Sequence, residues 1–227
     1  MPRMSPQLRR QAIVDATLAV ALRKGLATTT VRDVAAEMGS SSGLVHHYFD
    51  SMDDVLAAAF EQAAGGDLEA ARAKVAEVED PAGRLTRFLQ TYSPAQSDWT
   101  MQLWLDAWSE AARRPALQQA SRRLNLEWHA LIREIIDAGV RDGSFVCDDS
   151  NAAGWRLLSV LDGLALQVVA HDSVITRHDV LSWVTTAAEL ELSLPAPPGL
   201  PRIEQSAGQT PARRASTGSS EAARNDG

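Results

Sequence analysis

Cysteine, long apolar runs and several familiar enzyme signatures are scarce or missing in this chain. Its single cysteine, Cys147, excludes an internal disulfide and suits a reducing compartment, so we expect a cytoplasmic protein. No apolar run approaches the ~20 residues of a membrane span, and we expect no membrane association. Neither an H-E-x-x-H motif nor a glycine-rich phosphate loop occurs, which disfavours metalloproteases and nucleotide-dependent enzymes.

The alternation of apolar and polar residues that is typical of strands is also missing. Apolar residues recur with a helical period almost throughout, which predicts an all-α fold of about nine helices. Gly65–Gly66 lowers helix stability by about 2 kcal/mol relative to two alanines, so the fourth helix has a candidate bend or break there. We expect helices at about 5–24, 31–38, 42–48, 51–79, 81–92, 97–113, 115–141, 150–171 and 176–194.

The segment Thr28–Phe49 has the layout of a helix-turn-helix. Thr30 is a plausible N-cap, and Gly39 allows the positive φ that a tight turn needs. A helix-turn-helix places its second helix in the DNA major groove, and Gly43 would let that helix approach the backbone closely. We therefore expect DNA contacts from Thr30, Ser40, Ser41, Ser42, Gly43, Leu44, His46, His47, Tyr48 and Ser51.

Charge is distributed unevenly along the chain. The formal net charge is −7, which disfavours a protein that coats nucleic acid. Basic residues nevertheless crowd the first part of the chain, and no acidic residue stands between Ser40 and Phe49. This pattern favours selective binding through one local surface. The basic residues concerned are Arg3, Arg9, Arg10, Arg23, Lys24 and Arg32.

These residues resemble the TetR-type bacterial transcriptional regulators over about residues 9–60, and Gly43–Phe49 is most similar to the BetI-type branch. Two positions depart from the family pattern. His46 replaces a usual tyrosine, and Met52 replaces a usual lysine that contacts a DNA phosphate. The matching positions are Thr28–Thr30, Val34–Ala35, Gly39, Ser41, Gly43, His47–Phe49, Ser51 and Asp53–Asp54.

The resemblance implies a three-helix DNA-binding domain at residues 1–50 and a larger helical ligand-binding and dimerisation domain at 51–194. Residues 195–227 are rich in Pro, Gly, Ser and charge, and we expect a disordered tail. The helix at 150–171 is apolar nearly all round, which is typical of a helix buried on two sides. For the dimer interface we expect Leu158, Leu161, Val169, Trp183, Val184 and Ala187.

Six tryptophans against two tyrosines and four phenylalanines are the second unusual signal. Aromatic faces attract cations and form cages around quaternary ammonium groups, and nearby acids would add negative charge. The same tryptophans could equally fill a helical core, and Asp162 could be a satisfied buried carboxylate. Our candidate ligand residues are Trp99, Trp104, Trp108, Trp128, Trp155, Asp162 and Glu110.

The sequence thus predicts a homodimeric transcriptional repressor that a small molecule, with a cationic amine as the first candidate, releases from double-stranded operator DNA. We expect no catalytic residue, no cofactor and no metal site. Two alternatives remain open at this point. One is an all-α enzyme that uses scattered Asp, Glu and His residues, and the other is an architectural DNA-binding protein without a ligand.

Overall fold

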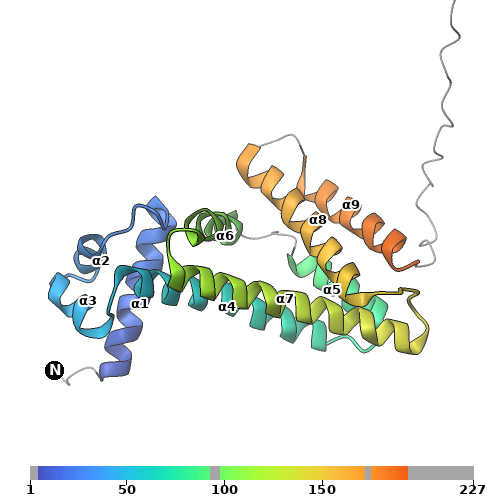
Figure 1. The fold of residues 1–227 in the computed structure, drawn as a ribbon, viewed down its shortest axis with the longest axis horizontal. Coiled ribbons are helices and arrows are strands. Elements are labelled where there is room, and N and C mark those ends of the chain that lie inside the picture. The colour runs from blue at the N-terminus through green and yellow to red at the C-terminus, as the bar shows by residue number, and fades with distance from the viewer. Residues whose placement is uncertain (1–4, 93–97, 172–174, 194–227) are drawn as a thin grey trace, which may run out of the picture. The chain divides into compact units, whose positions relative to one another are not determined.

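The structure, a computed structural model, describes residues 5–92, 98–171 and 175–193. Within these ranges the chain forms nine helices and no strand, so the predicted all-α class is confirmed (Figure 1). The expectations for Arg3 and for the tail lie outside the described residues. The helices are α1 (Pro6–Lys24), α2 (Val31–Glu37), α3 (Ser42–Tyr48), α4 (Met52–Ala76), α5 (Pro81–Tyr92), α6 (Asp98–Ala111), α7 (Pro115–Asp142), α8 (Ser150–His171) and α9 (Arg177–Glu191).

Local chemistry explains most of the helix boundaries. The Thr30 hydroxyl accepts a hydrogen bond from the Asp33 N–H at the start of α2, and the Asp33 carboxylate accepts one from the Thr30 N–H, so two otherwise unpaired donors are satisfied. Ser51 caps α4 by accepting from the Asp54 N–H at 3.2 Å. Gly39 follows α2 with a φ of 59°, as the predicted tight turn requires.

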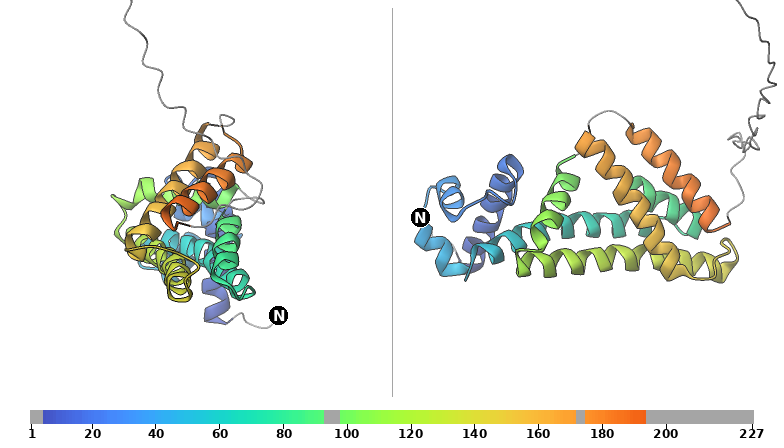
Figure 2. Two further views of the ribbon diagram at one scale, coloured as in Figure 1. Left: turned by 90° about the vertical axis from the view of Figure 1, so that its right-hand side faces the viewer. Right: turned by 45° about the horizontal axis from the view of Figure 1, so that its top comes forward.

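The fourth helix is continuous through Gly65–Gly66, so it does not break there. It ends at Ala76, a few residues before the expected end near Glu79. Tertiary packing outweighs the poor helix propensity of the glycines, because Ala64 and Leu68 on either side are fully buried. Figure 2 shows α4 and α7 running side by side, and the two helices contact one another extensively.

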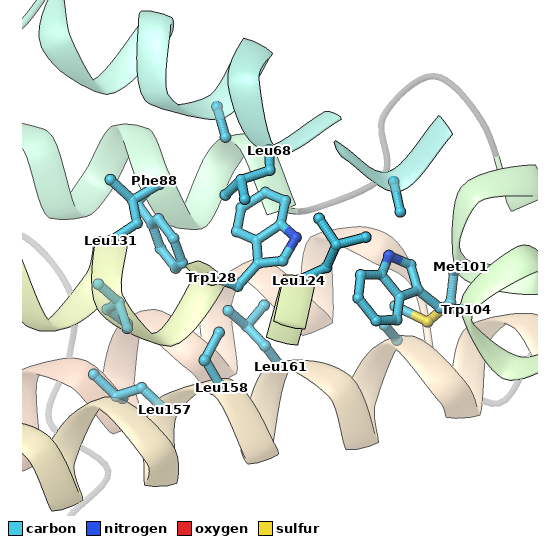
Figure 3. Packing of buried hydrophobic residues seen from close by; sticks show 14 of the residues in the cluster. Leu68, Phe88, Met101, Trp104, Leu124, Trp128, Leu131, Leu157, Leu158 and Leu161 are labelled. Carbon is cyan, nitrogen blue, oxygen red and sulfur yellow. The ribbon is translucent and has the colours of Figure 1, made fainter. Parts of the chain in front are cut away.

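Two clusters of buried apolar side chains hold the protein together. The smaller, which we call the head cluster, joins α1, α2 and α3 to the first turns of α4 through Ile13, Val34, Val45, Phe49 and Val55. The larger, the body cluster, joins α4 to the later helices. Figure 3 shows ten labelled members of it, among them residues of α4, α5, α6, α7 and α8. Because α4 supplies both clusters, it connects them, and α1 does so too, since Ile13 lies in the head cluster and Ala21 in the body cluster.

By length and composition alone, α8 could cross a membrane, which differs from our sequence expectation. A core helix passes the same test, and one face of α8 packs in the core while the rest of the helix is half-buried or exposed. Leu157, Leu158 and Leu161 on α8 are enclosed in the body cluster, and α8 also carries the charged side chains of Arg156 and Asp162. The Arg156 guanidinium pairs with the Glu191 carboxylate on α9. The packing therefore favours a structural role for α8 inside this fold.

Two glycines with opposite surroundings give a test of this packing. A Cβ on Gly139 would lie 2.2 Å from Cδ2 of the buried Phe145 ring, whereas a Cβ on the exposed Gly66 would meet nothing within 4 Å. We expect Gly139→Ala to lower the free energy of unfolding by about 1–3 kcal/mol through overpacking. Gly66→Ala should raise it by about 0.5–1 kcal/mol, because alanine is the better helix former.

Urea denaturation at one fixed protein concentration measures both glycine variants. A Gly139→Ala variant as stable as the wild type would show that Phe145 does not pack tightly on α7.

Candidate functional site

The second and third helices meet at a short turn that fixes the exposed face of α3. The N–H of Gly39 donates to the Ala36 carbonyl at 3.1 Å, and the N–H of Ser40 donates to the Ala35 carbonyl at 2.9 Å. On α3 the one buried residue is Val45, which lies in the head cluster. Phe49 follows, with the Arg10 guanidinium 4.4 Å from its ring centroid. One face of α3 is therefore packed against the rest of the protein, and the other is exposed to solvent.

The outward face of α3 carries most of the predicted DNA contacts. Ser41, Gly43, His46 and His47 are exposed, and Ser40, Ser42, Leu44 and Tyr48 are half-buried. His47 packs edge-on against Tyr48, with ring centroids 5.1 Å apart. A Cβ on Gly43 would have only the Ser41 Oγ near it, at 3.8 Å. The backbone at Gly43 is therefore open to the approach of a large partner.

Two predicted DNA contacts already have structural partners. The Thr30 hydroxyl belongs to the cap of α2, and the Ser51 hydroxyl donates to the Asp54 carboxylate at 2.7 Å while capping α4. Ser41 stands at the N-cap of α3, but its side chain makes no capping bond. Ser40 Oγ is buried and has no hydrogen-bond partner in the described part of the chain. The hydroxyl groups of Thr30 and Ser51 therefore serve mainly to cap α2 and α4, respectively.

The serine-nucleophile pattern of hydrolases, G-x-S-x-G, also occurs in this chain, since Gly39–Gly43 reads Gly-Ser-Ser-Ser-Gly. In hydrolases this pattern forms a sharp turn from a strand into a helix, which exposes the serine as a nucleophile. Here helix α2 precedes the turn, and the described residues contain no strand. The local structure thus lacks the setting that the catalytic motif requires.

Two of the predicted basic residues stabilise the unit formed by α1, α2 and α3, which we call the head. Arg23 pairs with Glu37 at 2.5 Å, and Lys24 pairs with Asp33 at 2.6 Å, so the end of α1 is tied to α2. Hydrogen bonds from Lys24 and Thr30 lower the pKa of Asp33 to about 2. Met52, at the position of the missing lysine, is half-buried and packs against both clusters.

Polar contacts also tie α6 to the head. The N–H of Leu26, just after α1, donates to Asp106 Oδ2 on α6 at 3.1 Å. The amide of Gln102, one turn earlier on α6, donates to the other Asp106 oxygen at 3.2 Å. This carboxylate satisfies a backbone donor that lies 80 positions away in the chain, which fixes the distance between α6 and the end of α1.

A second set of charges joins the end of α6 to the start of α4. Glu110 accepts from Arg113 at 2.5 Å and from Arg114 at 3.0 Å, and Arg114 also donates to Asp53 at 2.6 Å. The hydrogen bonds from Arg113 and Arg114 lower the pKa of the Glu110 carboxyl. Glu110 is buried, and both of its oxygens are engaged. Its predicted role in ligand binding is therefore replaced by a structural one.

Within the described part of the chain, the tryptophans that were predicted to bind a ligand pack against different aromatic partners and do not form one cluster of rings. Trp104 is edge-on to Phe60 at 4.9 Å and tilted against Trp108 at 5.6 Å. Trp128 is edge-on to Phe88 at 5.9 Å in the body cluster, where Figure 3 shows both rings.

Trp155 and Trp99 lie in other surroundings. Trp155 stacks on the buried His129 at 4.1 Å, and the His129 Nε2–H donates to the Asn151 carbonyl at 2.9 Å. Trp99 is exposed, and Asp162 is half-buried. The ring contacts thus favour core packing for Trp128 and Trp155, and Trp104 is likewise buried in the body cluster at the contact of α4 and α6.

The predicted dimer residues divide into two groups. Leu158, Leu161 and Val184 are enclosed by their own chain, so assigning them to a partner surface was wrong. Val169 and Ala187 are half-buried, and Trp183 is 48% exposed. The hydrophobic period shows that α8 is apolar on several sides but does not show which side its own chain covers. Other large exposed apolar side chains on α8 and α9 are Val160, Leu166 and Leu190.

An anchored α2–turn–α3 unit with an exposed polar face defines a helix-turn-helix DNA-binding regulator. Comparison with known proteins identifies its relatives. The model of bacterial regulatory proteins of the tetR family matches residues 13–59, and the model of the BetI-type transcriptional repressor C-terminal domain matches residues 81–193. The chain belongs to the TetR family of transcriptional regulators and has the C-terminal domain of BetI-type repressors.

Individual relatives agree with this assignment. The transcriptional regulator BetI of Paraburkholderia xenovorans is 32% identical over 173 residues, which cover 74% of this chain and 85% of that protein. BetI of Paraburkholderia phymatum is 31% identical and covers 71% and 81% of the two chains. The fold matches a Saccharomonospora viridis regulator crystallised with choline, with a TM-score of 0.75, 22% identity, and coverage of 82% and 98%. Neither alternative function gains support from these comparisons.

Gly43→Glu tests the placement of α3. Because a side chain fits at Gly43 and an acid near a helix start is favourable, the variant should fold normally. Its charge would face DNA phosphates, and such like-charge contacts cost several kcal/mol, so we expect operator affinity to fall at least about a hundredfold. Fluorescence anisotropy with labelled DNA from beside the protein's own gene measures the loss.

The matched control for this variant is Ala82→Glu, which adds the same charge at an exposed position on α5. It should bind DNA as the wild type does. Normal binding by Gly43→Glu, with an unchanged melting temperature, would show that α3 does not face the DNA.

Proposed function

We propose that this protein is a dimeric repressor that binds a near-palindromic operator through α3 and leaves it when a cationic small molecule binds. The exposed face of α3, held by buried Val45, is the observation that carries the DNA-binding part. The crystallised relative with choline supports a quaternary ammonium compound as the effector. The working place of such a repressor is the cytoplasm, and no catalytic step belongs to this proposal.

Within the head, residues 5–50 form the reading unit in this proposal. His46 and His47 are exposed and able to reach base edges or phosphates, and Tyr48 can donate to a phosphate. No acidic side chain stands between Ser40 and Phe49 to repel the backbone. Since Met52 brings no cation, phosphate binding depends more on the hydrogen-bond donors of α3.

The exposed apolar side chains of α8 and α9 support a two-fold dimer. Val160 and Leu166 on α8 are each 37% exposed, and Trp183 and Leu190 on α9 are 48% and 79% exposed. Covering such side chains with a second copy would remove apolar area from water. A two-fold axis there would present two α3 helices to half-sites ~34–36 Å apart.

The effector signal would reach the head through α6. One turn of α6 holds Trp104 in the body cluster, while Asp106 and Glu110 on the same helix connect to the head. A ligand that binds better when α6 is displaced would move the end of α1 and the start of α4 together. The equilibrium between the conformation with α6 in place and the one with α6 displaced shifts only as far as the ligand's affinities for these two conformations differ.

Operator release is the direct test of the proposed function. Labelled operator bound by the full-length protein is titrated with choline chloride and, in parallel, with the same concentrations of sodium chloride. The salt control matters because every protein–DNA complex weakens with ionic strength. We expect choline to lower operator affinity about tenfold or more beyond the sodium chloride effect. Equal curves for the two salts would contradict release by choline, and no sequence-specific binding at all would contradict the regulator.

Trp183→Glu tests the dimer surface. A charge at this exposed apolar position should not disturb the protomer, but it would face a desolvated partner surface and oppose association. We expect a monomer in size-exclusion chromatography with light scattering, and a matching loss of operator affinity. Leu126→Glu on α7 is the control, because Leu126 is also 48% exposed and should leave the dimer intact. A dimeric Trp183→Glu variant would place the interface elsewhere.

A further inference from the structure

Asp67 on α4 follows the run Ala63–Gly66, and in the sequence it is indistinguishable from a solvated helix position. In the structure it is half-buried, and its Oδ2 is enclosed without a hydrogen-bond partner among the described residues. Thr100 on α6 hydrogen-bonds to the carboxylate. A buried carboxylate oxygen without a partner is unfavourable, and a bound group that pairs with it would remove this cost.

No oppositely charged side chain in the described chain forms an ion pair with Asp67. Burial is the largest effect on its carboxyl and raises the pKa above the ordinary value, and the Thr100 hydrogen bond and the charge of Lys74 offset part of this rise. Lys74 is exposed two turns further along α4, and within the described chain no ion pair joins its ammonium to Asp67. The other acids between α6 and its neighbours are committed, since Asp106 binds the Leu26 N–H and Glu110 binds two arginines.

Aromatic rings line the same α4–α6 contact. Trp104 lies one turn after Thr100 on α6, and its ring packs edge-on against Phe60, which lies two turns before Asp67 on α4. Between Phe60 and Asp67, α4 presents only small residues to the core, Ala63 and Ala64. A carboxylate and an aromatic ring such as the Trp104 indole are the two kinds of group that bind an alkylated ammonium ion.

We propose that Asp67 is the counter-charge for the effector's ammonium group, which binds between α4 and α6 beside Trp104. This inference rests on the proposed function, because it assigns the effector's charge to a residue of the same regulatory domain. It also places the ligand directly on the two helices that connect to the head, α4 through Val55 and α6 through Asp106.

A competing location is the open hollow of about 430 Å³ at the end of α7, lined by Glu134, Asp137, Val140 and Arg141. Its central carboxylate, Asp137, already accepts from Ser150 at 2.5 Å and from Arg133 at 3.4 Å. Arg141 adds a positive charge to the lining, and no aromatic side chain lines it. This hollow is therefore a poor site for a cation.

Asp67→Asn tests the proposal in the full-length protein. The substitution keeps the shape of the side chain and removes the charge. The probes are choline and its neutral isostere 3,3-dimethylbutan-1-ol, both measured by isothermal titration calorimetry. We expect the variant to lose choline affinity about tenfold or more and to bind the neutral isostere as the wild type does. Operator affinity without choline should not change.

The matched control is Glu69→Gln, which removes an acid two residues away on α4 whose side chain is 76% exposed. It should bind choline as the wild type does. Asp67→Asn should also melt at a temperature equal to or above that of the wild type, because an enclosed charge is removed. Unchanged choline affinity in this folded variant would overturn the proposal and leave Asp67 a purely structural residue.

The outcomes separate this inference from the proposed function. Charge-dependent choline binding through Asp67, without specific operator binding, would support the ligand site and overturn the repressor. Specific operator binding, with no calorimetric binding of choline, tetramethylammonium or ethanolamine to the wild type, would overturn the ligand site and leave the DNA-binding regulator standing.

Discussion

The shared helix α4 is the constraint on which the rest of the structure depends. Val55 and Ala59 on α4 pack in the head cluster, while Leu56 and Phe60, one position further along, pack in the body cluster. Since consecutive residues of a helix point about 100° apart, one turn of α4 serves two cores at once. No flexible linker separates these cores. A rotation or shift of α4 within the body must therefore alter the position of α3 as well.

The sequence predicts local structure well, but it does not predict contacts between residues that lie far apart in the chain. Thr30 and Gly39 could be assigned because capping and turn formation involve residues only a few positions apart. Glu110 could not be assigned, because Arg114 contacts it and also contacts Asp53, which lies 61 positions away in the chain. The same limit applies to Leu158 and Val184. The spacing of these apolar residues predicts that they are buried, but only the packed protomer shows that their own chain covers them.

Three carboxylates near α6 show how the environment decides the use of one chemical group. Asp106 accepts from a backbone N–H and holds the end of α1. Glu110 lies between two guanidinium groups, which stabilise its ionised form. Asp67 has Thr100 as its hydrogen-bond partner on α6, and its enclosed Oδ2 has none among the described residues. Two of these acids thus connect helices, and one retains electrostatic capacity for a bound cation.

The unequal exposure of the tryptophans has an optical consequence. Trp104 and Trp128 are 7% and 6% exposed in the apolar body cluster, whereas Trp99 and Trp183 are 39% and 48% exposed. Indoles in apolar surroundings emit at shorter wavelengths than indoles in water, so the emission of this protein is a sum of distinguishable populations. Trp104 lies at the α4–α6 contact and Trp183 on the outer side of α9. The chain therefore carries separate built-in reporters for its interior and for its surface.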